Sequence, residues 1–414
     1  MVIVAALALV LVSPARQDGT WWKGNLHTHT LWSDGDDYPE MVVDWYKTRG
    51  YNFLALSDHN VLSEGERWFD LSGARGRGTP LANYIGRFGD DWVKTRVRDG
   101  KVEIRLRTLA EFRGLFEVPG KFLMVQSEEI SAGHGGKPIH VNATNIQEKI
   151  DPKSGESVLD TMQKNVDAVN EQRDRTGVPM FPHINHPNFV WAITAEELMK
   201  LEGEKFFEVY NGHPAVHNYG DATHTGMERV WDIILTKRLA ELGKEVMYGI
   251  AVDDAHSYFE MQLTKANPGR AWVMVRAKDL DAHSLVHAME DGDFYSSTGV
   301  VLDDVRFDGK SLAINVKPEP GVTYRTFFIG TRRGYDPTAT PVTGEDGEPL
   351  GVTMRYSDDI GVVLATVDGT TPRYALRGDE IYVRARVVSS KPKTNPYSEG
   401  ETETAWVQPV VPRS

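Results

Sequence analysis

Short apolar runs that end in polar residues recur along the first 300 residues of the chain. Residues 53–59 are apolar up to a final Ser-Asp-His, and residues 122–130 begin apolar and carry a pair of glutamates near their end. Residues 38–49 have a proline near their start and are followed by a glycine, which is typical of a helix. This order of strand, helix and strand predicts βαβ units, with the polar groups at the carboxyl ends of the strands.

The same alternation continues to about residue 299 and favours the parallel α/β barrel class, in a domain spanning residues 20–299. Further strands are predicted at residues 139–144, 180–184, 205–211, 246–252 and 271–276, and further helices at 155–176, 227–242 and 280–290. Residues 61–120 form a mixed insertion with helical patterns near 83–98 and 108–116, and an Arg- and Gly-rich loop is expected at 73–78. Whether this insertion covers a site as a lid stays open.

Beyond residue 300 the helical period disappears. Apolar residues alternate with polar ones in runs such as 312–316, 323–329, 361–367 and 380–388, and Gly, Pro and Asp separate these runs. This pattern predicts a small antiparallel β-sandwich over residues 300–414. The segment contains no histidine, so its expected role is packing against the barrel, and carbohydrate or substrate binding is the alternative.

Composition limits the chemistry. The 414 residues include no cysteine, which excludes disulfides, thiolate metal sites and cysteine nucleophiles. The formal net charge of −13 argues against nucleic acid as a general partner and against an anionic membrane surface. Residues 1–15 are apolar and end in Ser-Pro-Ala, which predicts a signal peptide, no stable membrane span, and a periplasmic or secreted protein. Because no Lys or Arg precedes this run, a buried first strand is the alternative.

A His-x-His pair follows the first strand-like run. Residues two apart on a strand point to the same side, so His27 and His29 direct both imidazoles to one end of the sheet. Asp34 offers a nearby oxygen ligand. Because cysteine is absent, any metal must be held by His, Asp and Glu.

The motifs HTH, SDH, EEIS, HVN, HP, EVYN and DAH, in this order over about residues 25–299, resemble the PHP superfamily, named for polymerase and histidinol phosphatase. The exported, CehA/McbA-like metallohydrolase branch is the most similar part of it. The resemblance implies a distorted (β/α)7, TIM-like barrel with two to three divalent metal ions, zinc, manganese or iron. Carried to this sequence, it implies three ligand groups: His27, His29, Glu129 and Asp254; Asp34, His59 and His256; and His140 with His186, which Glu129 bridges to the first group.

Other polar residues near the predicted strand ends receive weaker predictions. Asp58 is expected to support a ligand or accept a proton, and with Glu129, Asp254 and His59 it completes the predicted catalytic set. The predicted substrate-binding residues are His134, Lys137, Glu208, His213 and His217. His183 is expected to be structural, whereas Arg113 and Arg270 are possible phosphate clamps. His283 and His287 are expected on the exposed face of a helix.

These residues predict a metal-dependent hydrolase, most simply a phosphomonoesterase or phosphodiesterase that uses a metal-bridging hydroxide. The cations would make the pocket locally positive, so a small anionic ester is the expected substrate. Hydrolysis of a carbamate, amide or carboxylic ester on the same metals is one alternative, and a non-catalytic metal-binding protein is another. The oligomeric state and the physiological substrate are not predicted.

Overall fold

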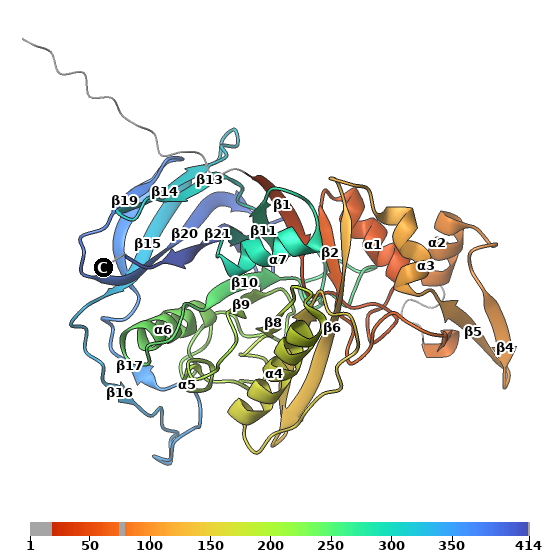
Figure 1. Ribbon diagram of the computed structural model, residues 1–414, viewed down its shortest axis with the longest axis horizontal. Coiled ribbons are helices and arrows are strands. Elements are labelled where there is room, and N and C mark those ends of the chain that lie inside the picture. The colour runs from red at the N-terminus through yellow and green to blue at the C-terminus, as the bar shows by residue number, and fades with distance from the viewer. Residues whose placement is uncertain (1–18, 74–78, 413–414) are drawn as a thin grey trace, which may run out of the picture.

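The computed structural model describes residues 19–73 and 79–412, so the predicted signal peptide and most of the predicted loop at 73–78 lie outside the described residues. Figure 1 shows one curved sheet that runs through the molecule, with helices against its outer face and a separate group of helices and strands at one end. The sheet has thirteen strands, in the order β10-β9-β8-β7-β6-β2-β1-β11-β12-β21-β20-β15-β18.

The strands of its first part alternate with helices, largely where the apolar pattern predicts them. The strands are β1 (Thr20–Asn25), β2 (Phe53–Leu56), β6 (Leu123–His134), β7 (Lys137–Thr144), β8 (Phe181–Ile184), β9 (Phe206–Asn211), β10 (Tyr248–Val252), β11 (Trp272–Ala277) and β12 (Phe294–Ser297). The helices are α1 (Pro39–Thr48), α4 (Val158–Thr176), α5 (Ala195–Leu198), α6 (Met227–Ala240) and α7 (Ala282–Glu290). Local signals set the helix ends: Ser157 caps the start of α4, and Gly177, in the left-handed region, ends it.

A (β/α)7 barrel is not what the strand pairing shows. Strands β1, β2 and β6 are parallel, as are β8, β9 and β10, but β7 runs antiparallel to both β6 and β8. The cause is the turn at Gly135 and Gly136, both with positive φ, because a tight turn without a crossover helix can only join antiparallel strands. The fold is therefore a mixed α/β sheet.

The sheet curls without completing its ladder. Strand β10 packs against β11 and β12, but side chains provide the hydrogen bonds to the backbone groups on its free edge. The Ser296 hydroxyl accepts from Ala251 N–H at 2.9 Å and donates to Gly249 C=O at 3.0 Å. The Gln408 amide pairs with both backbone groups of Gly249 at 3.0 and 2.8 Å. The sheet therefore stays open at β10, and side chains satisfy the backbone groups of Gly249 and Ala251 that a closed barrel would pair with a neighbouring strand.

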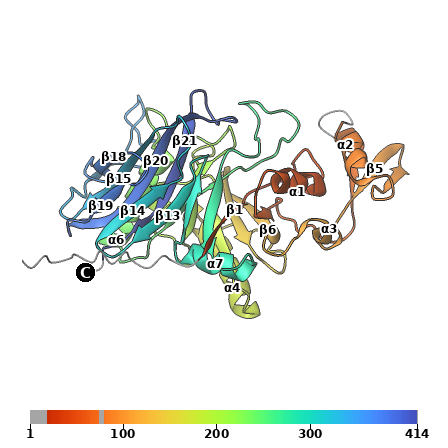
Figure 2. The same ribbon diagram turned by 90° about the horizontal axis from the view of Figure 1, so that it is seen from above.

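The insertion forms its own small layer at one end of the molecule (Figures 1 and 2). It contains β3 (Arg67–Asp70), η1 (Leu71–Gly73), α2 (Thr79–Phe88), β4 (Thr95–Arg98), β5 (Lys101–Leu106) and α3 (Leu109–Phe116). The helix predicted at 83–98 is wrong in its second half. Gly89 ends α2 in the left-handed region, and residues 95–98 instead form β4, which the Asp99-Gly100 turn, with φ of 50° and 75°, joins to β5 in a hairpin.

The C-terminal strands are β13 (Leu302–Phe307), β14 (Ser311–Val316), β15 (Tyr324–Arg332), β16 (Ala339–Thr340), β17 (Arg355–Tyr356), β18 (Val362–Asp368), β19 (Arg373–Ala375), β20 (Glu380–Pro392) and β21 (Thr402–Val410). The sheet β13-β14-β19 packs over β15, β20 and β21 through an apolar core that includes Leu312, Phe328 and Val383. Strand β21 also pairs with β12, so this layer continues the central sheet. The domain limits at 299 and 300 stay a prediction.

A search of residues 19–73 and 79–412 finds no helix with both the length and the apolarity needed to cross a bilayer.

Candidate metal centre

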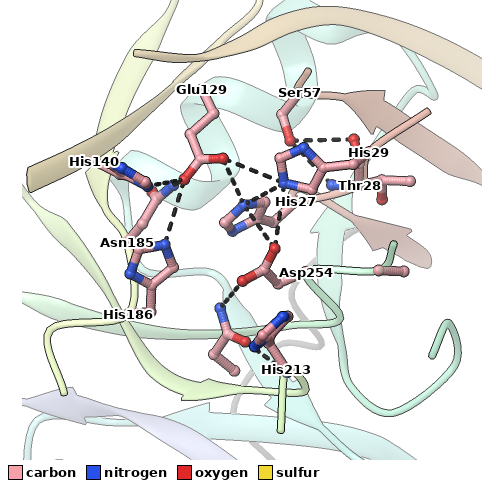
Figure 3. A network of polar contacts seen from close by, with 12 residues as sticks. His27, Thr28, His29, Ser57, Glu129, His140, Asn185, His186, His213 and Asp254 are labelled. Atoms are coloured by element: carbon pink, nitrogen blue, oxygen red, sulfur yellow. Dashed lines mark hydrogen bonds and ion pairs between the residues drawn. The ribbon is translucent and has the colours of Figure 1, made fainter. Parts of the chain in front are cut away.

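Four side chains from distant parts of the chain converge beyond the strand ends (Figure 3). The ligand atoms are His27 Nε2, His29 Nε2, Glu129 Oε2 and Asp254 Oδ1. The two imidazole nitrogens lie 3.1 Å apart, and each lies 3.2–3.3 Å from both carboxylate oxygens. A cation bound by four tetrahedral N and O ligands at its usual bond lengths separates them by roughly 3.3–3.5 Å. The distances within this group, called the inner cluster below, are close to that spacing, and His27, His29 and Glu129 together form a candidate metal-binding group.

Backbone contacts bring the inner cluster together. The His29 N–H donates to Ala255 C=O at 3.0 Å, and the Asp254 N–H donates to His27 C=O at 3.1 Å, so the segments after β1 and β10 are joined. Asp254 has a φ of 50°, a left-handed conformation that costs energy for a residue other than glycine. Asn211 donates to its second oxygen at 3.1 Å, which leaves Oδ1 for the cluster.

Glu129 divides its two oxygens between two groups of histidines. Its Oε2 faces the inner cluster, while its Oε1 lies 2.8 Å from His140 Nδ1 and 3.4 Å from His186 Nε2. Asn185 donates to Oε1 at 2.7 Å. The Oε2 atom is buried, and although His59 Nδ1 lies 2.9 Å from it, no described residue donates to it a hydrogen bond of good geometry. A carboxylate placed in this way has the geometry of a ligand that bridges two cations.

A third group lies at the rim. Asp34 Oδ1 is 3.3 Å from His256 Nε2 and 3.7 Å from His59 Nε2. Burial disfavours the charged form of Asp34, but hydrogen bonding and charge from His256, with the charges of His29 and His59, hold the pKa of this carboxyl well below its usual range. The three groups predicted from the sequence motifs therefore lie together in space, although whether they bind metal stays a prediction.

The cluster is electrostatically coupled. Burial lowers the pKa of His27, but the carboxylates of Asp254 and Glu208, with Glu129, outweigh it and raise that pKa well above its usual value. Burial disfavours the charged form of Glu129 and by itself would raise the pKa of this carboxyl. The surrounding imidazoles, with His59 the strongest, outweigh burial and hold that pKa well below its usual value. The inner cluster thus attracts positive charge, whether protons or a cation.

Glu208 lies behind the cluster, where a substrate does not reach. Its Oε1 is 2.6 Å from His27 Nδ1 and 3.3 Å from His183 Nε2, and its Oε2 accepts from His186 N–H at 2.7 Å. This placement differs from the predicted substrate contact. A carboxylate on Nδ1 directs the free Nε2 of an imidazole toward a metal, so Glu208 orients a ligand.

Asp58 holds the turn that carries His29 and Asp34. It is buried and accepts from the backbone and hydroxyl of Thr30, both at 2.8 Å, and from the Ser33 hydroxyl at 2.6 Å. With these donors around it, Asp58 positions the turn, which agrees with the predicted support of a ligand; the alternative role as a proton acceptor stays a prediction.

Strand alternation separates the two neighbouring glutamate candidates, whereas the two histidine candidates differ because His186 lies beyond the end of β8. Glu128 points to the opposite face of β6 from Glu129, accepts from Ile150 N–H, and has a pKa that burial raises to about 7. His183, within β8, contacts Glu208, whereas His186 faces Glu129. The structure thus brings Glu129 and His186, as selected by the motifs, into the cluster.

A cavity of about 140 Å³ opens onto the groups. The residues that line it are Asp34, His59, Glu129, His140, His186, Phe189, His213, Asp254 and His256. Of the predicted substrate-binding residues, only His213 is among them. Burial lowers the pKa of His213 to about 4, so this imidazole is neutral at pH 7. No lining residue comes from the insertion at 61–120.

The other predicted contacts lie elsewhere. His134 contacts Gly155 C=O at 3.1 Å, Lys137 is on the β6–β7 turn, and His217 stacks on Trp191 with ring centres 4.4 Å apart. Arg113 donates to the Met124 carbonyl. The buried Arg270 donates to the carbonyls of Gly212 and Gln262. Neither arginine lines the cavity.

Two residues of the site were not predicted from the sequence. Asn185, in the run His-Ile-Asn-His-Pro, orients Glu129, and Phe189 supplies the apolar part of the cavity wall. Asn185 lies between two candidate histidines in the sequence, and this position could have indicated that it belongs to the site. Phe189 had none, since only the loop conformation brings its ring to the cavity.

Comparison with known proteins assigns no family. No family model matches the chain, and no curated protein matches it. Among solved structures, it resembles a two-domain protein from Bacteroides vulgatus containing a predicted PHP-like metal-dependent phosphoesterase, at 13% identity and a TM-score of 0.39, over 96% of this chain and 99% of that one. An amidohydrolase from Chromobacterium violaceum with bound sulfate and no metal matches at 14% identity and a TM-score of 0.28, over 57% and 88%. Similarities this low assign neither family nor activity.

Proposed function

We propose that this chain is a metal-dependent hydrolase, and within that class a phosphoesterase. The observation that carries the proposal is the inner cluster, in which His27 Nε2 and His29 Nε2 lie 3.1 Å apart and each lies 3.2–3.3 Å from one oxygen of Glu129 and one of Asp254. The two-sided Glu129 beside it extends the site toward His140 and His186. Donors of this kind suit zinc, manganese or iron. The resemblance to an exported PHP branch and the periplasmic or secreted location remain predictions.

The inner cluster, the Asp34–His59–His256 group and the His140–His186 pair would hold the cations. Bound there, divalent cations supply Lewis acidity and lower the pKa of water near neutrality. The chain's own residues orient the site: Glu208 aligns His27, Asn185 and Asn211 fix the carboxylates, and Asp58 holds the rim turn.

The cavity and its charge favour a phosphoryl group. At about 140 Å³ it is smaller than the roughly 300–1,000 Å³ of pockets that enclose whole drug-sized ligands, so it admits the reacting head of an ester and leaves the rest outside. Two or three dications would exceed the charge of the three candidate carboxylate ligands, Asp34, Glu129 and Asp254. A surplus of positive charge stabilises a phosphoryl transition state more than the single oxyanion of a carboxylic ester or carbamate.

Metal content tests the proposal that the protein is a metal-dependent hydrolase. Protein purified after growth with added zinc, manganese and iron should contain about two to three equivalents of metal, and chelation should abolish activity that metal restores. Fewer than about one equivalent would contradict a multinuclear site.

A substrate panel tests the proposal that the hydrolase is a phosphoesterase. p-Nitrophenyl phosphate, its diesters, p-nitrophenyl acetate and a p-nitrophenyl carbamate share a leaving group, so kcat/KM compares only the reacting centre. We expect a phosphoester to be fastest. A carbamate or carboxylic ester faster by about tenfold, or about 1.4 kcal/mol, would replace the phosphoesterase proposal. No turnover in fully metallated protein would favour a metal-binding protein.

A further inference from the structure

Two residues of the cavity wall lie outside the candidate ligand groups. All other lining residues belong to the inner cluster, the rim group or the His140–His186 pair, which leaves Phe189 and His213. A substrate that enters the cavity would contact this part of the wall, because the ligand atoms would be directed at the bound cations. Of the two residues, only His213 can form a hydrogen bond.

The loop that carries His213 is tied at both ends. The Asn211 side chain accepts from His213 N–H at 2.7 Å, and the amide of Asn218 donates to Asn211 C=O at 2.8 Å. Gly212 packs against Arg270 and the Asp253 carbonyl, where an added Cβ would approach atoms to 2.9 Å, so only glycine fits. The imidazole therefore stands on a fixed backbone.

The ring's tautomer follows from one contact. Ala215 N–H donates to His213 Nδ1 at 3.1 Å. A nitrogen that accepts a hydrogen bond carries no proton, so the proton of the ring is on Nε2. Nε2 contacts no acceptor in the described part of the chain. The ring also packs edge-on against Phe189 and His256, with centroid distances of 6.2 and 5.5 Å, which limits its rotation.

We propose that His213 Nε2–H donates a hydrogen bond to a non-bridging oxygen of an anionic ester bound in this cavity. The inference rests on the proposed function and names the residue that recognises the substrate's charged head. A neutral imidazole would have to become an imidazolate to protonate a leaving group, so His213 acts as a hydrogen-bond donor and transfers no proton. Its contribution is therefore independent of the leaving group.

The test compares three variants of the zinc-loaded full-length chain. His213→Phe keeps a ring and removes the donor, whereas His213→Gln retains an N–H donor near the Nε2 position. His224→Phe is the matched control, because His224 lies on the same segment, pairs with Asp221 at 2.9 Å and stacks on Trp191 outside the cavity. The measurements are bound zinc per chain, the Kd of inorganic phosphate by calorimetry, and kcat/KM for p-nitrophenyl and phenyl phosphate.

With His213→Phe we expect unchanged zinc content, a Kd for phosphate weakened by roughly tenfold, and kcat/KM lowered by roughly 10- to 100-fold. The loss should agree within about threefold between the two substrates, since no proton moves to the leaving group. His213→Gln should recover most of both losses, and His224→Phe should match the unmodified protein. Nitrogen NMR of the zinc-loaded protein should show the Nε2–H tautomer at His213.

Loss of a zinc equivalent in His213→Phe would make the residue a ligand and overturn the proposal. So would unchanged phosphate affinity, an Nδ1–H tautomer, or a Gln variant no better than the Phe variant. A larger loss with phenyl than with p-nitrophenyl phosphate would identify a proton donor instead. If the unmodified protein hydrolyses no phosphoester, the proposed function fails, while phosphate affinity and the tautomer still decide the role of His213.

Discussion

Among the buried networks of charged side chains in residues 19–73 and 79–412, two differ in one instructive respect. Where α6 meets β20, Arg384 donates to both oxygens of Asp232, at 2.8 and 2.7 Å, and the Tyr382 hydroxyl donates to the same carboxylate at 2.7 Å. Each charge faces its opposite, and each oxygen of the Asp232 carboxylate accepts a hydrogen bond. This network, called the α6–β20 network below, is complete as it stands.

The inner cluster is incomplete by the same measure. Two imidazole nitrogens face each other at 3.1 Å, two carboxylates face the same point, and no described residue donates a hydrogen bond of good geometry to the buried Glu129 Oε2. An unsatisfied buried carboxylate oxygen costs stability unless something compensates it. The comparison shows that burial and charge do not by themselves identify a site. The distinguishing feature is a set of donor atoms that lacks a central partner.

The largest expected effect comes from Glu129→Gln, which retains the shape but removes the charge shared by two histidine groups. We expect kcat/KM to fall by several orders of magnitude and the bound metal to decrease, because an amide cannot bridge two cations with both ends. Elemental analysis and phosphatase assays measure both. Activity within tenfold of the unmodified protein would show that Glu129 is outside the chemistry.

Asp232→Asn should affect folding and spare the site. It leaves the buried Arg384 with Glu228, at 3.3 Å, as its remaining counter-charge, so the loss should approach the cost of breaking a buried pair, about 3–5 kcal/mol of unfolding free energy. Denaturant unfolding measures the loss, while metal content and kcat per folded molecule should stay the same. Replacing both partners by apolar residues, Asp232→Leu with Arg384→Met, should recover much of the stability. A loss of metal in Asp232→Asn would mean that the two networks are coupled.

The affinity of the site for metal should depend on pH through the inner cluster. The α6–β20 network should not contribute to this pH dependence. In the metal-free protein the pKa of His27 is raised well above 6.5, so this imidazole keeps its proton at neutral pH. A metal binds only the neutral ring, so binding releases that proton. Affinity therefore rises with pH up to the raised pKa, by about tenfold per unit for each proton released, and levels off above it. Zinc calorimetry in buffers with different ionisation heats counts the protons. An affinity constant between pH 6 and 8 would contradict the shift.

The smallest effect is expected at a histidine pair outside both networks. His283 and His287 are exposed on α7, with ring centres 4.3 Å apart. Glu290 Oε2 lies 3.6 Å from His287 Nδ1, but this pair is in none of the candidate metal-binding groups of the described residues. His283→Ala should leave kcat/KM and metal content within about threefold of the unmodified protein, as is usual for surface changes. A larger change would mean that imidazole content alone, wherever it lies, affects the metal count.

Much of the site was predictable because its signals are local. The two-residue spacing of His27 and His29 acts over a few residues, and Glu129 was selected over Glu128 by the short motif that contains it, a choice with which the alternation of β6 agrees. The error at residues 83–98 was also local: the Asp99-Gly100 turn and Gly89 were readable signals that the helical pattern concealed.

The sequence pattern was thus sufficient to predict on which face of a strand each side chain lies, since the backbone period sets this over a few residues. Tertiary structure decided which of them meet. Glu208 reaches His27 across 181 residues, His213 lines the cavity while His217 on the same loop stacks on Trp191, and β21 joins β12 into one sheet. These outcomes depend on strand order and direction, which the short period of a single strand does not encode. The physical reason is that a local pattern orients a side chain, whereas only packing between distant segments supplies its neighbour.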